Sequence, residues 1–452
     1  MYMYMFFFFF FFFFFFFFFF FIIYFLFMIP LSFLLDYFLF FFFFFFFFFF
    51  GNIKSVYFGC ISYSLGFDKY SYLFICLSCI ICLMMIYSML FYSYFGFSYF
   101  LFYVNFLFLT LFMVFIVMDF FSFYFFFECS LVPLFLIIFG WGYQPERLQA
   151  GFFLILYTLF ASFPFLLCIF FVSSNFGIFN YFINYFLDSN YVMFFILFSF
   201  LVKFPIFGFH IWLPSAHVEA PSCGSMILAG VMLKLGGYGL IRSMPFIYNF
   251  IFNYGYFFIN LSLFGCLLIS LYCLVQSDMK MLIAYSSVCH MSMVISGLFS
   301  MFDWCLLGSM VFMIGHGFVS SGLFFLVGLL YNRFGSRSFF ILSGLMGLNS
   351  SMSLFWFLFS ICNMSCPPSI NLFSEICLVL GLLNWSNLLL YYMMFILFFS
   401  ACYSLMIFSF SQHGVYSSML KFTCMFYVSE YFVLIIHLIP VFILILKMDY
   451  FF

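Results

Sequence analysis

The sequence predicts an all-α integral membrane protein with about fourteen membrane-spanning helices. Of its 452 residues, 69% are hydrophobic and only 5% are charged, whereas soluble domains carry about 25% charged residues. So few charges cannot cover a water-facing surface. At about 20 apolar residues for each spanning helix, the length accommodates a dozen or more spans in a single membrane domain.

Apolar runs separated by polar breaks define the expected spans. The first two are rich in phenylalanine, with sixteen in succession at 6–21 and eleven at 40–50. We expect them to be spans, because they lack the basic start and the cleavage site of a signal peptide. Basic residues divide almost evenly between the two sides, so they do not fix the orientation. The spans are expected at 6–28, 31–50, 71–92, 95–117, 119–139, 150–172, 191–213, 222–242, 252–275, 281–300, 304–330, 353–382, 388–410 and 425–447.

Two of these spans contain proline near the middle. Pro205 interrupts the seventh span, and Pro367 with Pro368 interrupts the twelfth. Each proline removes a backbone donor and frees a carbonyl group. In lipid such groups must face protein or a water-filled cavity, so paired interruptions are typical of transport pathways. Packing kinks without a transport role are the alternative interpretation.

The ionisable residues fall into two sets. Those in the gaps are interpreted as loop residues that face water or lipid headgroups: Arg147, Arg242, Asp278, Lys280, Asp303, Arg333 and Arg337. The other set lies inside spans. A charged side chain at a helix centre costs about 2.5–3.5 kcal/mol in a bilayer, so these residues are expected to face a polar interior. They are Glu128, Lys203, Lys234, His290, His316 and Glu375.

This second set has the chemistry of a proton relay. Burial favours the neutral forms of lysine and glutamate, whereas a nearby opposite charge favours the ionised forms. A lysine therefore takes up or releases a proton as its glutamate partner approaches or recedes, and histidine passes protons between such groups. Water and the hydroxyl groups of Tyr285, Ser286 and Ser287 would complete the path. Structural ion pairs and helix contacts are the alternative for any single residue.

Other polar residues leave the interpretation open. His210 and His217 flank Pro214 and either line the pathway or fix the break, and the same holds for Glu219. A haem site remains a minor alternative for histidines in membrane helices. The sixteen cysteines show no paired spacing typical of zinc or iron-sulfur ligands. With no basic run, nothing indicates nucleic acid as a partner.

Five strings, which run from about 128 to 375, resemble successive signatures of the antiporter-like membrane subunits of mitochondrial NADH:ubiquinone oxidoreductase, respiratory complex I. The resemblance is greater to the chain 4 family than to the chain 2 or chain 5 subunits or to cation/proton antiporter subunits. The strings are WGYQPERLQAG, LVKFPIFGFHIWLPSAHVEAPSCGSMILAGVMLKLGGYGLIR, DMKMLIAYSSVCHMSMV, MIGHGFVSSGLFF and CPPSINLFSEI.

The resemblance implies fourteen helices with two inverted five-helix repeats, whose helices 7 and 12 are discontinuous. It implies a first half-channel at 118–242 and a second at 252–410. N-terminal helices at 1–117 and a C-terminal helix at 425–452 complete the single membrane domain, and the first two helices and the C-terminal tail are expected from hydropathy alone. It also implies roles for the buried residues. Glu128 and Lys203 would gate the first half-channel, Lys234 would be the central carrier, His290 and His316 would bridge the halves, and Glu375 would serve the exit.

The implied function is proton translocation across the mitochondrial inner membrane, coupled to NADH oxidation by ubiquinone. The resemblance implies no cofactor on this chain, because FMN, iron-sulfur clusters, NADH and ubiquinone bind to other subunits of the complex. The implied partners are the neighbouring chain 2 and chain 5 subunits and lipids. The alternatives are a sodium/proton antiporter subunit and a scaffold subunit that keeps only the fold.

Overall fold

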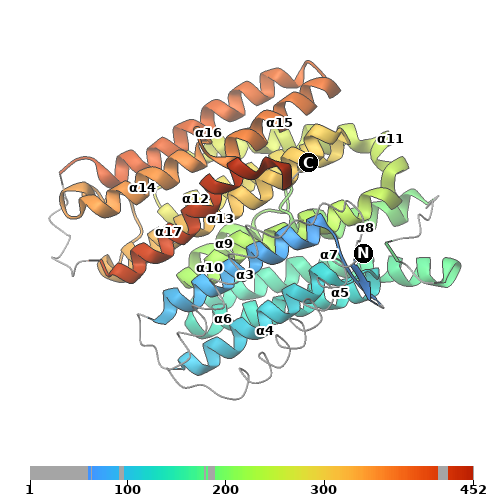
Figure 1. Ribbon diagram of the computed structural model, residues 1–452, viewed down its shortest axis with the longest axis horizontal. Coiled ribbons are helices and arrows are strands. Elements are labelled where there is room, and N and C mark those ends of the chain that lie inside the picture. The colour runs from blue at the N-terminus through green and yellow to red at the C-terminus, as the bar shows by residue number, and fades with distance from the viewer. Residues whose placement is uncertain are drawn as a thin grey trace, which may run out of the picture.

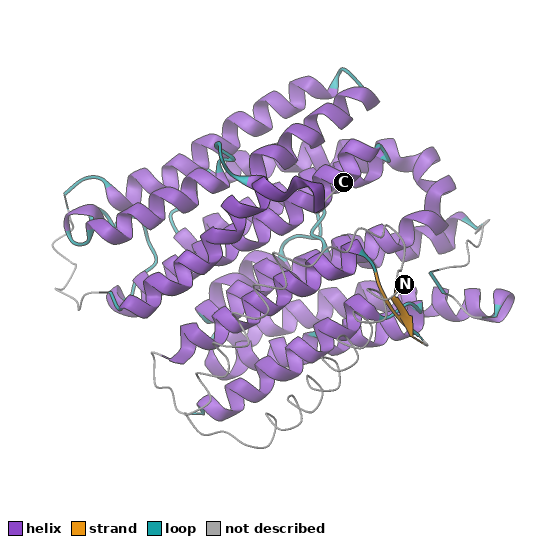
Figure 2. Ribbon diagram, viewed as in Figure 1, coloured by secondary structure: helices purple, strands orange, loops and turns teal. Residues whose placement is uncertain are grey.

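The computed structural model describes residues 60–62, 64–90, 96–177, 180–181, 189–415 and 426–450. Within them the chain is almost entirely helical, apart from an antiparallel hairpin of β1 (Cys60–Ser62) and β2 (Leu65–Phe67) (Figure 2). The two phenylalanine-rich spans expected at 6–28 and 31–50 lie outside the described residues. The predicted all-helical membrane class is confirmed.

The first described helix starts from a hydrogen-bonded cap. At the beginning of α3 (Lys69–Leu90), the backbone N–H of Ser71 donates to Asp68 Oδ1 at 2.8 Å. In return, the backbone N–H of Asp68 donates to Ser71 Oγ at 2.9 Å. This exchange satisfies N–H groups that a first helical turn leaves open. α4 (Phe97–Ile116) packs on α3, and both helices agree with their expected spans.

The fifth expected span is divided into two helices. α5 (Phe120–Cys129) and α6 (Leu131–Trp141) meet at Ser130, so Glu128 lies beside the junction. α7 (Arg147–Phe176) follows as one long helix that packs against α6.

The seventh expected span is interrupted where the proline indicated. α8 (Asn190–Lys203) ends just before Phe204-Pro205, and the helix resumes as α9 (Trp212–Glu219). The indole N–H of Trp212 donates to the carbonyl oxygen of Val202 at 3.2 Å. This bond satisfies a carbonyl group that the break leaves without a helical partner.

A long helical stretch follows. α10 (Ser222–Ile227) leads through the π-helical turn η2 (Leu228–Met232) into α11 (Leu233–Cys273). In Figure 1, α11 curves as it passes from the helices that precede it in the chain to those that follow it.

One predicted boundary is wrong. The gap expected between the eighth and ninth spans, at 243–251, is helical and belongs to α11. Its polar residues resemble a loop, but Pro245 is accommodated inside the helix, where a proline can bend the helix without ending it. The 41 residues of α11 would measure about 60 Å if straight, twice the ~30 Å hydrocarbon core, so this stretch is long enough for two crossings.

The remaining elements form the second part of the bundle. They are α12 (Met279–Ser300), α13 (Asp303–Phe334), η3 (Leu345–Gly347), α14 (Ser350–Asn363), α15 (Ile370–Trp385), α16 (Leu389–Gln412), α17 (Val428–Ile443) and η4 (Leu444–Tyr450). The twelfth expected span is broken between α14 and α15. There the side-chain amide of Asn371 donates to the carbonyl oxygen of Cys362 at 2.9 Å.

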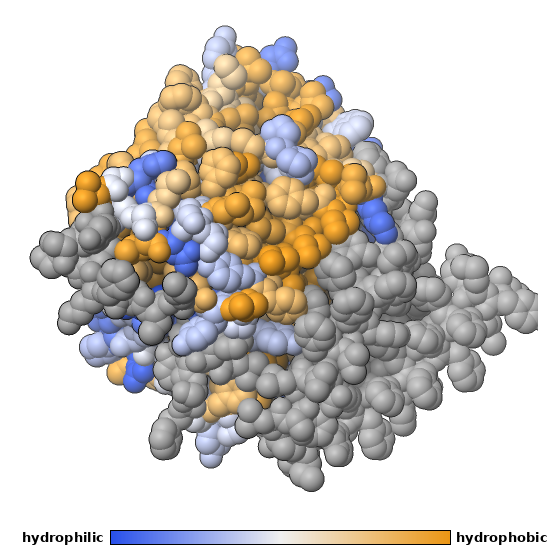
Figure 3. Space-filling view, turned by 60° about the vertical axis from the view of Figure 1, so that its left-hand side comes forward, coloured by the Kyte–Doolittle hydropathy of each residue, from blue (hydrophilic) through white to orange (hydrophobic). Residues whose placement is uncertain are grey.

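Burial divides the helices into central and peripheral ones. α13 packs against α3, α10, α12, α15 and α17, and its middle is entirely buried. α7 and α16 instead expose large apolar side chains such as Phe160, Leu167 and Phe398. Figure 3 shows apolar residues covering large continuous areas of the described surface. Within the described ranges, nine helices are long and apolar enough to cross a membrane.

Candidate functional site

Glu128 and Lys203 form an ion pair, although 75 residues separate them in the chain. Lys203 Nζ lies 3.1 Å from Glu128 Oε1 and donates to the carbonyl oxygen of Phe127 at 3.2 Å. It also lies 2.9 Å from the centroid of the Phe127 ring. The C-terminal ends of α5 and α8 therefore hold a cation between a carboxylate, a carbonyl group and a ring face.

Lys234 is completely buried near the start of α11. Its Nζ donates to the carbonyl oxygen of Ala229, which belongs to the preceding π-helical turn η2. A π-helical turn disturbs the regular hydrogen-bond ladder and is frequent at functional sites. Among the described residues no carboxylate forms a salt bridge with Lys234.

Glycine lets the helix of Lys234 approach the break after Lys203. A Cβ atom built on Gly236 would lie 2.8 Å from the backbone nitrogen of Phe204 and 3.0 Å from the carbonyl oxygen of Phe200. The first distance is shorter than the contacts that real Cβ atoms make, and the second is tighter than most of them. The backbones of α11 and α8 thus touch beside both lysines.

His290 and His316 lie side by side on α12 and α13. Their ring centroids are 4.9 Å apart, and both rings are buried. His290 Nε2 lies 3.0 Å from the hydroxyl oxygen of Tyr403 on α16. His290 Nδ1 and both ring nitrogens of His316 have no hydrogen-bond partner among the described residues. Buried polar atoms of this kind are ordinarily satisfied by water.

Glu375 lies at the second break. Ser365, between α14 and α15, donates its hydroxyl hydrogen to Glu375 Oε2 at 2.5 Å, while Oε1 has no partner among the described residues. Asn371, one turn earlier on α15, packs against Gly315, the neighbour of His316. The break therefore brings Glu375 close to the helix of the second histidine.

The two histidines of the first break differ in their surroundings. His217 is fully buried and stacks on Phe324 of α13, with ring centroids 4.4 Å apart. His210 is partly exposed, stacks on Phe207 and accepts a hydrogen bond at Nδ1 from the backbone N–H of Gly208 at 3.3 Å. Local contacts of this kind favour the interpretation that His210 fixes the break.

The expected hydroxyl groups are engaged locally. Ser286 and Ser287 donate to the carbonyl oxygens of Ile283 and Ala284, both at 2.7 Å, within their own helix. Tyr285 packs edge-on against Tyr272, with ring centroids 5.0 Å apart.

Lys280 was expected in a loop, and that prediction is wrong. It is buried at the start of α12, where its Nζ donates to the carbonyl oxygen of Ala220 at 2.9 Å and lies 5.3 Å from the Tyr143 ring centroid. Hydropathy placed it at the edge of a span. Its position at a helix N-terminus was the available signal, because a cation there opposes the helix dipole and needs other acceptors.

Near Lys280, Glu219 ends α9. Arg337 Nη1 lies 3.8 Å from Glu219 Oε1, and Arg337 Nε lies 3.4 Å from Asp278 Oδ2. Burial raises the pKa of the Glu219 carboxyl above its ordinary value, although the Arg337 guanidinium opposes this effect.

Two further arginines assigned to loops are instead in buried or half-buried ion pairs. Arg242 of α11 contacts Asp68 twice, with Nη1 2.6 Å from Oδ2 and Nη2 2.7 Å from Oδ1. Arg333 Nη2 lies 2.5 Å from Glu430 Oε2 and joins α13 to α17. The sequence offered no sign of either pairing, because both partners come from distant parts of the chain.

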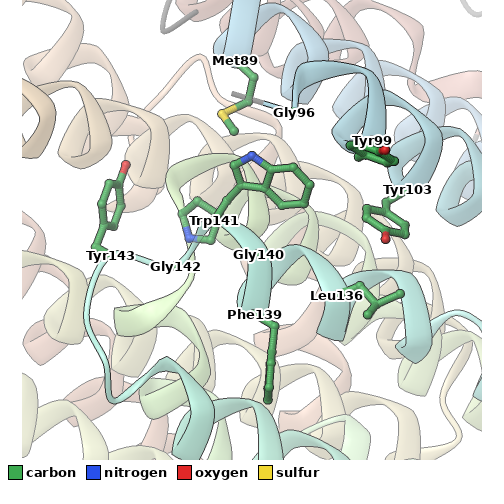
Figure 4. Close-up of a pocket in the computed structure, with 11 residues that line it drawn as sticks. Met89, Gly96, Tyr99, Tyr103, Leu136, Phe139, Gly140, Trp141, Gly142 and Tyr143 are labelled. Atoms are coloured by element: carbon green, nitrogen blue, oxygen red, sulfur yellow. The ribbon is translucent and has the colours of Figure 1, made fainter. Parts of the chain in front are cut away.

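A separate pocket of about 750 Å³ lies near the junction of α3, α4 and α6. Figure 4 shows the Trp141 ring at its centre, with Tyr99 and Tyr103 side by side along one wall. None of the acidic, basic or histidine residues described above lines it, although Tyr143, which contacts Lys280, does. The candidate residues at the two breaks and on α11, α12 and α13 therefore lie outside this pocket.

Among the described residues, no group of three or more histidine, cysteine, aspartate or glutamate side chains is arranged to hold a metal ion. Cys76, Cys79 and Cys82 are buried in α3 among apolar side chains, as small hydrophobic residues often are.

Comparison with known proteins shows the family of this chain. Residues 117–404 match the family described as NADH:quinone oxidoreductase/Mrp antiporter, transmembrane. NADH-ubiquinone oxidoreductase chain 4 of Ceratitis capitata is 46% identical over 87% of this chain and 89% of its own length. The chain 4 protein of Locusta migratoria is 47% identical with the same coverage. The chain belongs to the NADH-ubiquinone oxidoreductase chain 4 family.

Solved structures share the fold of this chain 4 family member. A chain of respiratory complex I from Thermus thermophilus superposes with a TM-score of 0.82 at 21% identity, covering 92% of this chain and 91% of that one. A chain of the Mrp complex from Dietzia superposes with a TM-score of 0.73 at 17% identity, covering 78% and 68%. At these identities the likeness concerns the fold alone.

Proposed function

We propose that this chain is the proton-translocating, antiporter-like chain 4 subunit of respiratory complex I. The observation that carries the proposal is a series of ionisable residues inside an apolar helix bundle, of which Glu128 is partly buried and the others are buried. The series comprises Glu128, Lys203, Lys234, His290, His316 and Glu375. Buried ion pairs add little net stability compared with apolar packing, so a function in transport is the better explanation for retaining them.

The first step of the proposed path is the gating pair. While Glu128 remains 3.1 Å from Lys203, its charge favours the ammonium form of the lysine. Withdrawal of the carboxylate removes this stabilisation, and the proton moves on toward Lys234. Packing at Gly236 brings the helix of Lys234 against the break after Lys203.

The second part of the proposed path lies between the halves. Lys234 has a carbonyl acceptor and no paired carboxylate among the described residues, so its charged form depends on water and on nearby groups. His290 and His316 are the next titratable pair, and Glu375 beside the second break serves the exit. His217, buried against α13, would line the path, whereas His210 would hold the first break in place.

The same proposal bears on the membrane, the partner subunits and the cofactors around this chain. The chain is a multi-pass protein of the mitochondrial inner membrane. Its proposed contacts there are lipids and the chain 2 and chain 5 subunits. NADH, FMN, iron-sulfur clusters and ubiquinone would bind to other subunits, so this chain would move protons without redox chemistry of its own. The curated relatives at 46% and 47% identity carry the chain 4 name, which disfavours a free-standing sodium/proton antiporter.

Replacing Lys234 by methionine tests the proposal. Methionine keeps most of the side-chain volume and removes the titratable group, so the complex should assemble while coupled turnover and proton pumping fall by about tenfold or more. Both are measured in membrane vesicles of a genetically tractable relative. Lys447→Met, in the C-terminal segment η4, is the control and should pump normally. Full pumping by the Lys234→Met complex would refute the proposed function.

A further inference from the structure

Tyr403 is a buried hydroxyl group on a helix whose other face points outward. α16 exposes Tyr391, Phe395 and Phe398, whereas the side chain of Tyr403 is 0% exposed. A tyrosine buried in this way normally directs its hydroxyl group to a specific partner, because an unpaired one costs free energy. The partner identifies what Tyr403 can do.

That partner is His290. The Tyr403 hydroxyl oxygen lies 3.0 Å from His290 Nε2, and the two rings meet at 75° with centroids 6.2 Å apart. His290 also contacts His316, and its Nδ1 has no hydrogen-bond partner among the described residues. One nitrogen of His290 is thus engaged by Tyr403, while the other is open to exchange a proton.

A carboxylate is carried by the helix next to that of Tyr403. α16 packs against α15, which carries Glu375 near the second break. Glu375 Oε2 is held by Ser365, but Oε1 has no partner among the described residues. An acceptor for a proton that leaves Tyr403 is therefore present on the neighbouring helix.

We propose that Tyr403 is a further member of the proton path and carries protons from His290 toward Glu375, an inference that rests on the proposed function. A proton binds to Nδ1 of neutral His290. The Nε2–H bond then breaks as a new O–H bond forms on Tyr403, and the original hydroxyl hydrogen passes to the Glu375 carboxylate, directly or through one water. One proton enters and one leaves, and the phenol stays neutral.

Replacing Tyr403 by phenylalanine removes only the hydroxyl group and keeps the ring packed against His290. The assembled complex should retain its normal amount, while coupled turnover and pumping fall by about tenfold, since positioned proton-transfer groups contribute roughly 10²–10⁴-fold and water replaces the hydroxyl in part. The solvent deuterium isotope effect on turnover should rise. A purely structural role would leave that effect unchanged. Tyr391→Phe, on the exposed face of α16, is the matched control and should pump normally.

A double variant keeps the test decisive. If Tyr403 acts through His290, the double variant Tyr403→Phe/His290→Gln should pump no worse than His290→Gln alone. Multiplied losses, or full pumping with an unchanged isotope effect in Tyr403→Phe, would overturn the inference. The Lys234→Met complex distinguishes a failure of the proposed function from a failure of the role of Tyr403. Full pumping there refutes the proposed function, whereas its loss together with full pumping in Tyr403→Phe refutes only the role of Tyr403.

Discussion

Lys203 shows how a single buried lysine is held in more than one way. Besides Glu128, its ammonium group contacts the Phe127 carbonyl oxygen and ring. Lys203 is also the last residue of α8, where the negative end of the helix dipole favours a cation. The carbonyl group and the ring therefore keep the Lys203 side chain in place when the carboxylate moves away, while the loss of the carboxylate charge favours release of the proton.

Replacing Glu128 by glutamine should block this gate. Removing one partner of a buried ion pair costs about 3–5 kcal/mol, so Lys203 should prefer its neutral form and load protons poorly. Because 1.4 kcal/mol is about a factor of ten, pumping per NADH oxidised should fall at least about tenfold. Proton uptake by vesicles measures the effect. Glu146→Gln, at an exposed position before α7, should change nothing, and retained coupling in Glu128→Gln would place the gate elsewhere.

At the scale of residues, the sequence predicted the candidate site where a charged residue stands inside an apolar run. Glu128, Lys203 and Lys234 lie inside apolar runs, so the free energy of burying a charge already pointed to a polar interior. Lys280 and Tyr403 were missed for physical reasons. Lys280 stands at the edge of an apolar run, where hydropathy cannot separate a buried lysine from a solvated one, and tyrosine is compatible with any helix surface.

At the scale of elements, the breaks position the site. The helix of Lys234 reaches the end of α8 only because Gly236 has no side chain, since a Cβ there would lie 2.8 Å from the backbone of Phe204. Backbone atoms cannot move aside as a flexible side chain can. The contact is therefore more sensitive to added volume than the surrounding apolar packing.

Gly236→Ala should accordingly separate α11 from α8. Overpacking typically costs about 1–3 kcal/mol, and the displaced α11 should also slow transfer between Lys203 and Lys234. We expect a lower melting temperature of the assembled complex together with reduced pumping. Gly140→Ala on α6 is the control, because a Cβ there meets nothing within 4 Å. Equal melting temperatures and equal pumping in the two variants would show that the close approach of α11 and α8 does not matter for function.

The interruptions were predictable and the continuity of α11 was not. Proline lacks an N–H group, so Pro205 and Pro367 were candidates for breaks, and the structure has breaks at both places. The segment 243–251 looked like a loop because hydropathy reports polarity, whereas helicity depends on backbone hydrogen bonds that polar residues do not prevent. The count of fourteen helices and the inverted repeats stay predictions, since 1–59 lies outside the described residues.

At the scale of the whole molecule, ion pairs tie the ends of the bundle to its centre. Arg333 lies in the last turn of α13 and Glu430 in the first turn of α17, with Nη2 and Oε2 2.5 Å apart. Each charge therefore also has the favourable sign for the dipole of its own helix. Glu430 Oε2 additionally accepts from the backbone N–H of Tyr427 at 3.0 Å and caps α17.

Glu430→Gln should loosen α17 from α13. The loss of one partner from a buried pair costs about 3–5 kcal/mol, so the complex should melt at lower temperature and its C-terminal helix should become sensitive to protease. Exchanging the charges, with Arg333→Glu and Glu430→Arg, should restore only part of the stability, because each charge then opposes a helix dipole. Complete restoration would mean that the dipoles contribute nothing here.

The helical segment at 243–251 also limits how the chain can be altered. A hydropathy profile would choose this segment for an affinity tag or for dividing the gene into two parts. Because α11 is continuous there, each inserted residue would turn its second crossing by about 100° relative to the first. The face of α11 that packs on α12 therefore has a fixed angle about the helix axis relative to the face that carries Lys234. Only an insertion of a nearly whole number of helical turns would preserve that angle.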